Sequence, residues 1–130
     1  MDLFVLQVLQ NKAAQIVTKS PPRAHRDPMY DRLGWLTVQQ LVVYHTVLAI
    51  YRIRQTSEPE YLARQFQNDN RNGRIIVPKC KLGLAMKSFC VRGADTWNTL
   101  PSHVRQSRRL RDFKMKARNW VKTNVPRFVQ

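Results

Sequence analysis

The chain has 130 residues, a mass of 15.3 kDa, 43% hydrophobic and 9% aromatic residues, and a formal net charge of +15. This apolar content excludes a chain that stays disordered for lack of core-forming side chains, and the length suits one modest core. There is no apolar run of about 18 residues, no basic secretory start, and only two cysteines, which together favour an intracellular protein, nuclear or cytoplasmic.

The first predicted helix covers residues 2–18. Apolar residues recur in it at spacings of three and four, and Asp2 is placed to cap its first turn. Three more apolar residues widen this face: Phe4, Val5 and Val8. We therefore expect the helix to pack on two sides. It ends at Ser20-Pro21-Pro22, because neither proline has an N–H to donate.

Residues 23–36 are predicted to be a connector, with turn signals at Asp27-Pro28 and Gly34-Trp35. A second helix then runs from Thr37 to about Gln55, since Thr37-x-x-Gln40 fits a capping box in which each side chain reaches the other's backbone N–H. We expect this to be the central core helix. Its predicted inward residues are Val38, Leu41, Val42, Val47, Leu48, Tyr51 and, less clearly, Ile50.

A second capping box, Ser57-x-x-Glu60, predicts a short helix through Phe66. Residues 68–73 follow as a loop rich in turn-forming side chains. Ile75-Ile76-Val77 is the one predicted extended segment, and Pro78 ends it. No partner strand is evident, so we expect this segment to lie on the helices.

Two further helices are predicted in the last third of the chain. The first covers residues 84–96, with Gly93 weakening its middle, and 97–101 close it. The second is capped by Ser102 or Ser107 and runs to about Lys122. Its apolar stripe consists of Leu110, Phe113, Ala117, Trp120 and Val121. The sequence thus predicts a mainly α fold, a small helical domain of four to five helices with one short extended segment near Ile75-Val77.

The positive charge is concentrated in the second half of the chain. Residues 1–70 hold eight basic and six acidic residues, a net +2, whereas residues 71–130 hold fifteen and two, a net +13. We expect a helical core half, 1–66, and a basic half, 67–130, within one domain, 1–130. Such an excess attracts polyanions, with nucleic acid the commonest partner and an anionic membrane the second. A merely solvated face is the plainer alternative, but solubility does not require so many charges.

The candidate nucleic-acid contacts are basic residues of that half. They are Arg74, Lys79, Lys81, Lys87, Arg92, Arg105, Arg108, Arg109, Arg111, Lys114, Lys116, Arg118 and Lys122. The basic residues of the last helix would face the phosphate backbone while its apolar stripe docks on the core. Trp97 and Trp120 are either core aromatics, which we favour, or platforms for unpaired bases. Residues 105–118 also fit an unspecific nuclear-import patch.

Patterns of catalysis and of metal binding are missing from the sequence. The eight acidic residues are scattered without an Asp-Asp pair, and no glycine-rich phosphate loop occurs. Cys80, Cys90 and His103 would need a fourth ligand to hold a metal, so buried or idle thiols are the ordinary interpretation. We therefore predict no enzyme activity, no metal and no cofactor.

Six short sequence words occur in a particular order. They are Leu9-Gln10-Asn11-Lys12-Ala13-Ala14; Leu33-Gly34-Trp35-Leu36 with Val38; Pro59 with Tyr61-Leu62; Val77-Pro78-Lys79; Ser88-Phe89 before Trp97-Asn98-Thr99-Leu100-Pro101; and Phe113-Lys114. In this order they resemble the segment after the fingers, palm and thumb of LINE-type retrotransposon reverse transcriptases, the elements without terminal repeats. Thr37 stands where that family has proline, and the segment 108–111 is more basic than in family members.

The resemblance implies a piece of a larger RNA-directed DNA polymerase. The catalytic carboxylates of that family belong to its palm, upstream of this segment, so no catalytic residue is carried over. The region after the thumb helps to hold RNA template and DNA target. An excised fragment, a degraded element copy and a captured host gene all fit, and charge alone does not separate RNA from DNA.

Three functional hypotheses follow. The leading one is a non-catalytic nucleic-acid-binding domain that grips RNA or DNA through a basic helical face. The alternative is a structural or protein-interaction module that braces a polymerase or another chain, favoured by the extra apolar residues of the first helix. Membrane binding through the last helix ranks third, because a globular core gives its apolar stripe another place to pack, and no membrane partner is expected.

Overall fold

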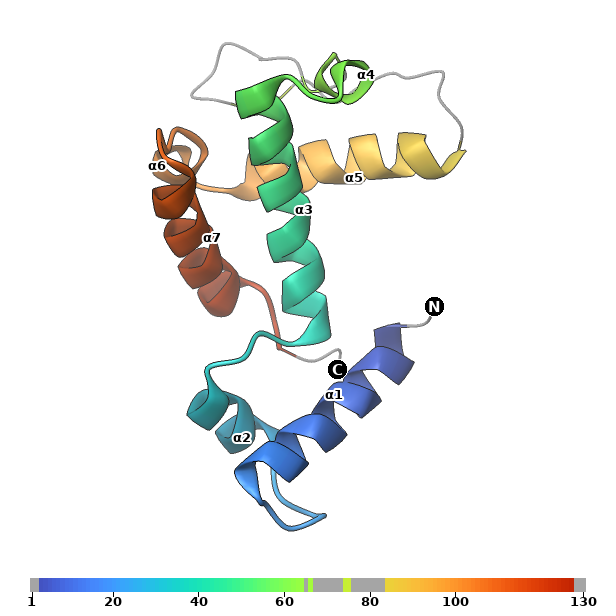
Figure 1. Cartoon of the computed structure of the whole chain (residues 1–130), viewed down its shortest axis with the longest axis vertical. Coiled ribbons are helices and arrows are strands. Elements are labelled where there is room, and N and C mark those ends of the chain that lie inside the picture. Colours follow the sequence, from blue (N-terminus) through green and yellow to red (C-terminus); the bar gives the residue numbers. More distant parts are fainter. Residues whose placement is uncertain (1–2, 65, 67–73, 76–83, 128–130) are drawn as a thin grey trace. The chain divides into compact units, whose positions relative to one another are not determined.

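The computed structural model describes residues 3–64, 66, 74–75 and 84–127, with the side chains of 84–88 left aside. Helices account for most of this part of the chain (Figure 1). They are α1 (Leu3–Thr18), α2 (Arg26–Leu33), α3 (Val38–Thr56), α4 (Glu60–Ala63), α5 (Leu84–Thr99), α6 (Ser102–Arg105) and α7 (Leu110–Asn124). The predicted mainly α fold class is confirmed. No single helix in the described ranges is long and apolar enough to cross a membrane; α2 and α3 meet that criterion only together, as a bent pair.

The chain forms two compact units. The first unit consists of Met1–Val42 with Lys122–Gln130, and the second unit consists of Val43–Val121. By sequence the second unit holds 16 basic and 5 acidic residues, a net +11. The division at residue 66 follows the charge along the chain and stays a prediction.

In the first unit, α1 turns a polar stripe inward. The buried hydroxyl of Tyr30 in α2 accepts a hydrogen bond from Nε2 of Gln7 (2.8 Å) and donates to Oδ1 of Asn11 (2.6 Å). A buried phenol needs such partners. The expectation that α1 packs its apolar residues on two sides is wrong: Leu3, Phe4, Val5, Val8, Leu9, Ile16 and Val17 are 38–75% exposed. The proposed cap, Asp2, lies outside the described residues.

The predicted connector 23–36 contains a helix, which corrects that prediction. Asp27 and Pro28 occupy the first turn of α2, where an acidic side chain and a proline are both favourable. Gly34 ends the helix with a φ of 68°, and its N–H donates to the Tyr30 carbonyl at 2.8 Å. The two turn signals are therefore the start and stop signals of a short helix.

The capping box at the start of α3 is confirmed. The Thr37 N–H donates to Oε1 of Gln40 (3.1 Å), and the Gln40 N–H donates to Oγ1 of Thr37 (3.4 Å). Gln40 is buried, and its Nε2 donates to the Val125 carbonyl within the same unit. Of the predicted inward residues, Val47, Leu48, Ile50 and Tyr51 are buried, Val38 and Leu41 are half-buried, and Val42 is exposed, contrary to prediction.

The second capping box does not form. Ser57 has a φ of 57°, and its N–H donates to the Ile53 carbonyl at 2.7 Å, so it belongs to the end of α3. Pro59 takes the N-cap position of α4 without a side-chain hydrogen bond. The short helix exists, but it ends at Ala63, and Phe66 lies beyond it in the core.

The core of the second unit lies where α3, α5 and α7 meet. Phe113 of α7 stacks on Tyr51 of α3, with ring centroids 4.2 Å apart, and on Trp97 of α5 at 5.6 Å. A Cβ on Gly93 would lie 2.9 Å from Cδ1 of Ile50, so glycine permits the close crossing of α3 and α5 seen in Figure 1. The predicted stripe of α7 is largely confirmed: Phe113, Ala117 and Val121 are fully buried, Trp120 packs against the core, and Leu110 is exposed.

Neither proposed serine caps the last helix. Ser102 begins a separate short helix, α6, and the Oγ of Ser107 donates to the Val104 carbonyl at 2.7 Å. The first backbone hydrogen bond of α7 runs from the Phe113 N–H to the Arg109 carbonyl (3.0 Å). The predicted start of this helix at 102 or 107 is therefore wrong, because α6 and a connection precede it.

Part of the predicted extended segment is described. Ile75 is buried, and its N–H and carbonyl both bond to the side-chain amide of Asn98 in α5, each at 2.8 Å. Ile76, Val77 and the loop 68–73 lie outside the described residues. At Ile75 the side-chain amide of Asn98 takes the place of a partner strand, and Ile75 lies against α5, as expected for the segment.

Candidate nucleic-acid interface

Three of the predicted contact residues have no described side chain. Lys79 and Lys81 lie outside the described residues, and Lys87 lies in α5 without a described side chain. Arg92, also in α5, is exposed and lines neither of the hollows described below. The remaining members, apart from Arg74, lie between residues 105 and 122.

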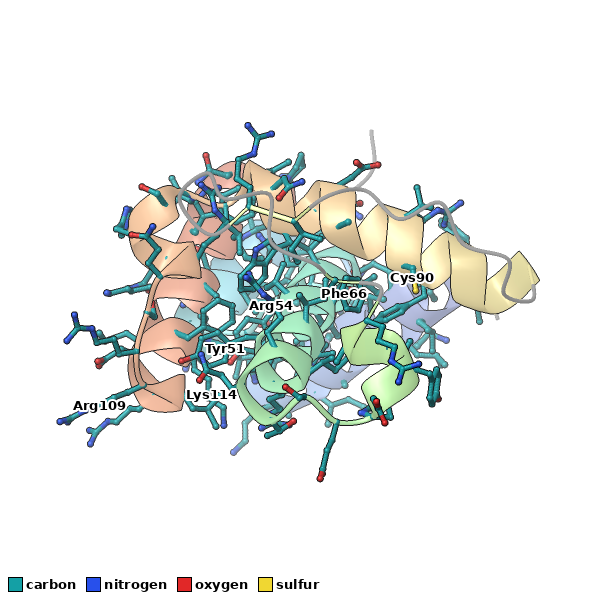
Figure 2. All side chains as sticks on the ribbon, turned by 90° about the horizontal axis from the view of Figure 1, so that it is seen from above. Tyr51, Arg54, Phe66, Cys90, Arg109 and Lys114 are labelled. Carbon is teal, nitrogen blue, oxygen red and sulfur yellow. The ribbon has the colours of Figure 1, made fainter. Side chains whose placement is uncertain are left out.

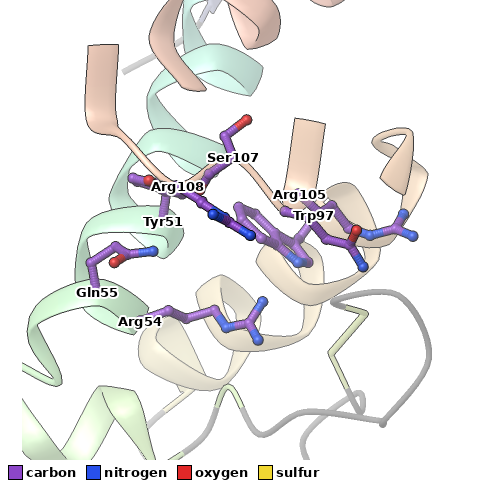
Figure 3. Close-up of a pocket in the computed structure, with 8 residues that line it drawn as sticks. Tyr51, Arg54, Gln55, Trp97, Arg105, Ser107 and Arg108 are labelled. Carbon is purple, nitrogen blue, oxygen red and sulfur yellow. Dashed lines mark hydrogen bonds between the residues drawn. The ribbon is translucent and has the colours of Figure 1, made fainter. Parts of the chain in front are cut away.

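A cavity of about 440 Å³ lies within the second unit, and we call it the arginine cavity (Figure 3). Its walls come from α3, from the ends of α5 and α6, and from the segment that joins α6 to α7. The residues that line it are Tyr51, Arg54, Gln55, Trp97 and 105–108. Among these described lining residues there are three arginines and no Asp or Glu, so the cavity presents positive charge.

Arg54 was not predicted as a contact residue. Its guanidinium carbon lies 5.4 Å from the centroid of the Trp97 ring, a cation–π arrangement that holds the side chain in place. Burial lowers the pKa of Arg54, and the charge of Arg105 lowers it further. Charge counting missed Arg54 because it lies in the nearly neutral part of the sequence. Trp97 itself is 1% exposed, so the core interpretation of this ring is confirmed.

Arg105 is the last residue of α6, and its side chain is hydrogen-bonded to backbone carbonyls at the end of α5. Its Nη1 donates to the carbonyl of Asn98 (3.3 Å) and to the carbonyl of Leu100. Burial lowers the pKa of Arg105, and the charge of exposed Arg74 lowers it further. Arginines from three separate segments therefore lie close enough for their charges to repel one another.

Arg108 completes the arginine cavity. It is exposed, and in Figure 3 the guanidinium groups of Arg54 and Arg108 lie beside the Trp97 indole, while the Arg105 side chain extends away from the ring. Tyr51 fixes the connection that carries Arg108, because its hydroxyl donates to the Ser107 carbonyl at 2.9 Å. The connection after α6 and helix α3 thus place Arg108, which was predicted as a contact, and Arg54, which was not, in the same cavity.

A second hollow, of about 650 Å³, runs beside α7, and we call it the α7 groove. Its apolar lining residues are Tyr44, Leu110 and Met115. Three predicted contact residues line it as well: Arg111, Lys114 and Arg118. A groove lined by both apolar and cationic side chains can contact sugars and bases while neutralising phosphates.

The other basic residues of this region do not join these hollows. Arg109 extends away from the helices (Figure 2), and Lys116 is half-buried outside the α7 groove. Lys122 is exposed and belongs to the first unit. The predicted single basic face of the last helix is therefore divided.

Within the described part of the chain, no three His, Cys, Asp or Glu side chains gather as a metal site would require. Cys90 is buried in the core, near the labelled Phe66 in Figure 2, whereas Cys80 lies outside the described residues. No protein-family model, curated protein or solved structure matches the chain.

Proposed function

We propose that this chain is a non-catalytic nucleic-acid-binding domain that grips the phosphate backbone of RNA or DNA. The observation that carries the proposal is the pair of cationic hollows in the second unit, the arginine cavity and the α7 groove. The excess of basic residues in that unit supports it. Lys and Arg side chains bind nucleic acid by neutralising phosphates and releasing counterions.

The proposed binding does not discriminate strongly between sequences. Contacts to phosphates position a protein on nucleic acid but carry no base information, and no base-reading module was recognised in the sequence. The proposed origin, a region beyond the thumb of a LINE-type reverse transcriptase, is supported by the six sequence words. A palm domain with its catalytic aspartates encoded upstream of Met1 would support that origin, and an unrelated upstream sequence would oppose it.

A salt series tests the binding. Fluorescence anisotropy with labelled single-stranded RNA, single-stranded DNA and duplex DNA gives the association constant between about 50 and 200 mM salt. We expect log K to fall linearly with log salt, by about 0.7 per neutralised phosphate for single strands and 0.9 for duplex.

Variants that remove charge test which basic residues contact the phosphates. Replacing Arg111, Lys114 and Arg118 with glutamine should reduce the salt slope by about 2–3, since each of the three lost phosphate contacts removes about 0.7 to 0.9. The matched control replaces Lys12, Arg23 and Arg52, three exposed cations outside both hollows. Binding that is absent, or insensitive to salt, would refute the proposal.

A second candidate function is a protein-interaction module. The specific observation is the exposed apolar face of α1, defined by the seven residues Leu3, Phe4, Val5, Val8, Leu9, Ile16 and Val17. Exposed apolar side chains gathered on one helix often mark an interface with another chain. The rest of a reverse transcriptase, or another protein, would cover it.

A further inference from the structure

We infer that the arginine cavity binds one phosphate group of a nucleic-acid strand, an inference that rests on the proposed function. The cavity draws Arg54 from α3, Arg105 from α6 and Arg108 from the connection to α7. The arginine cavity thus provides one defined phosphate-binding site on a surface whose other basic residues are spread out.

The chemistry of the lining selects an anion. Guanidinium groups carry forked N–H donors and stay charged at neutral pH, so they recognise oxyanions through paired hydrogen bonds. Burial lowers the pKa of both Arg54 and Arg105, and a neighbouring arginine lowers each further, Arg105 in the case of Arg54 and Arg74 in the case of Arg105, so an anion bound beside them would offset a repulsion already present in the fold.

A phosphate fits better than a nucleobase or a flat carboxylate. Arg54 lies over the Trp97 ring, and that ring is buried, so a base cannot stack on it. The three arginines of the lining come from three different segments of the chain, so their donors can reach a tetrahedral group with several accepting oxygens from more than one side. Gln55 and Gln106 add amide donors to the walls. The volume of about 440 Å³ leaves room for the sugar attached to the phosphate.

The donors are held in place before any ligand arrives. Arg54 rests against Trp97, and Arg105 is tied to two backbone carbonyls at the end of α5. The Tyr51 hydrogen bond to Ser107 steadies the segment that leads into Arg108. Preorganised donors lose less entropy on binding, so affinity for a single phosphate rises.

Two sources of phosphate share this chemistry, namely a terminal 5′-phosphate and an internal phosphodiester. The test therefore compares the same oligonucleotide with and without a 5′-phosphate, by anisotropy at fixed salt. In parallel, inorganic phosphate is titrated against the full chain at constant ionic strength, and the indole N–H resonance of Trp97 is followed by NMR.

The test variants are Arg54→Gln and Arg108→Gln, because Arg105 also braces the backbone. Arg52→Gln is the matched control: it removes the same charge from the same helix, and Arg52 is exposed outside the cavity. Arg54→Lys keeps the charge but loses the fork, and circular dichroism melting shows that each variant is folded.

We expect phosphate to shift the Trp97 resonance in the unmodified chain and in Arg52→Gln, and to bind about tenfold more weakly in Arg54→Gln. A gain on 5′-phosphorylation that Arg54→Gln abolishes identifies the terminal phosphate. An equal loss for both oligonucleotides identifies an internal one. Arg54→Lys should be intermediate.

The inference is overturned if phosphate leaves the Trp97 resonance unmoved and both test variants bind the two oligonucleotides as Arg52→Gln does. Nucleic-acid binding through the α7 groove would then stand. If the proposed function itself is wrong, neither the unmodified chain nor any variant will bind an RNA or DNA strand at low salt. If inorganic phosphate still shifts the Trp97 resonance in that case, the cavity binds free phosphate only, and the nucleic-acid part of the inference is overturned.

Discussion

Asn98 satisfies both backbone groups of a buried residue with one side chain. Its amide accepts from the N–H of Ile75 and donates to its carbonyl, as a neighbouring strand would. Asn98 belongs to the Trp97–Pro101 word that contributes to the family resemblance. In this structure that asparagine has a structural role, holding the extended chain against α5.

We predict that Asn98→Ala lowers the free energy of unfolding by about 1–3 kcal/mol, because two buried backbone groups lose their partner. Urea denaturation followed by circular dichroism measures the change. Asp95→Ala, an exposed position on the same helix, is the control and should stay within about 0.5 kcal/mol. Equal stability of the two variants would show that Ile75 does not depend on the amide.

At the level of single helices, a capping signal within one turn is reliable only where no neighbouring helix uses the same residue. The capping box of Thr37 and Gln40 is of this kind, and it formed. Ser57 fits the same pattern, yet the end of α3 uses its N–H and sets its φ at 57°. Two neighbouring helices competed for one residue, and the sequence pattern of either helix alone does not reveal this.

The short helix α2 depends on its C-terminal glycine. At Gly34 the φ of 68° is a left-handed conformation that costs other residues energy, and open space surrounds the missing Cβ. We predict that Gly34→Ala destabilises the first unit by about 1 kcal/mol, and that Gly34→Asn costs less, since asparagine tolerates this conformation. Thermal denaturation of the two variants gives the ranking, and a stabilised Gly34→Ala would contradict it.

For the whole molecule, periodicity identified helix α1 but not the face that it buries. The apolar residues of α1 form the natural inward stripe by pattern, yet the buried hydroxyl of Tyr30 recruits Gln7, Gln10 and Asn11. The exposed apolar face of α1 is therefore a result of tertiary packing.

We predict that this face makes the chain self-associate as its concentration rises, most clearly at high salt, where repulsion between its positive charges is screened. Sedimentation velocity measures the association. The double variant Phe4→Ser with Ile16→Ser should remove it, because these side chains are 73% and 75% exposed. Tyr61→Ser, at an exposed residue of α4, is the control. A monomer at every concentration would argue against α1 as an interaction surface.

The sequence alone was sufficient for the helical class, the approximate bounds of α1, α3 and α5, and the concentration of charge beyond residue 70. These features depend on residue type and on spacings of three or four, which a linear pattern contains. Only the tertiary structure decided which face of α1 is buried, how Asn98 pairs with Ile75, and how Arg54 joins Arg105 and Arg108 in the arginine cavity. Each of these features depends on contacts between residues far apart in the chain. Leaving a buried polar group or charge without partners costs free energy, and this cost favours the packing that is observed. Of the 23 basic residues behind the net charge of +15, six line the two cationic hollows, and one of these six, Arg54, comes from the nearly neutral half.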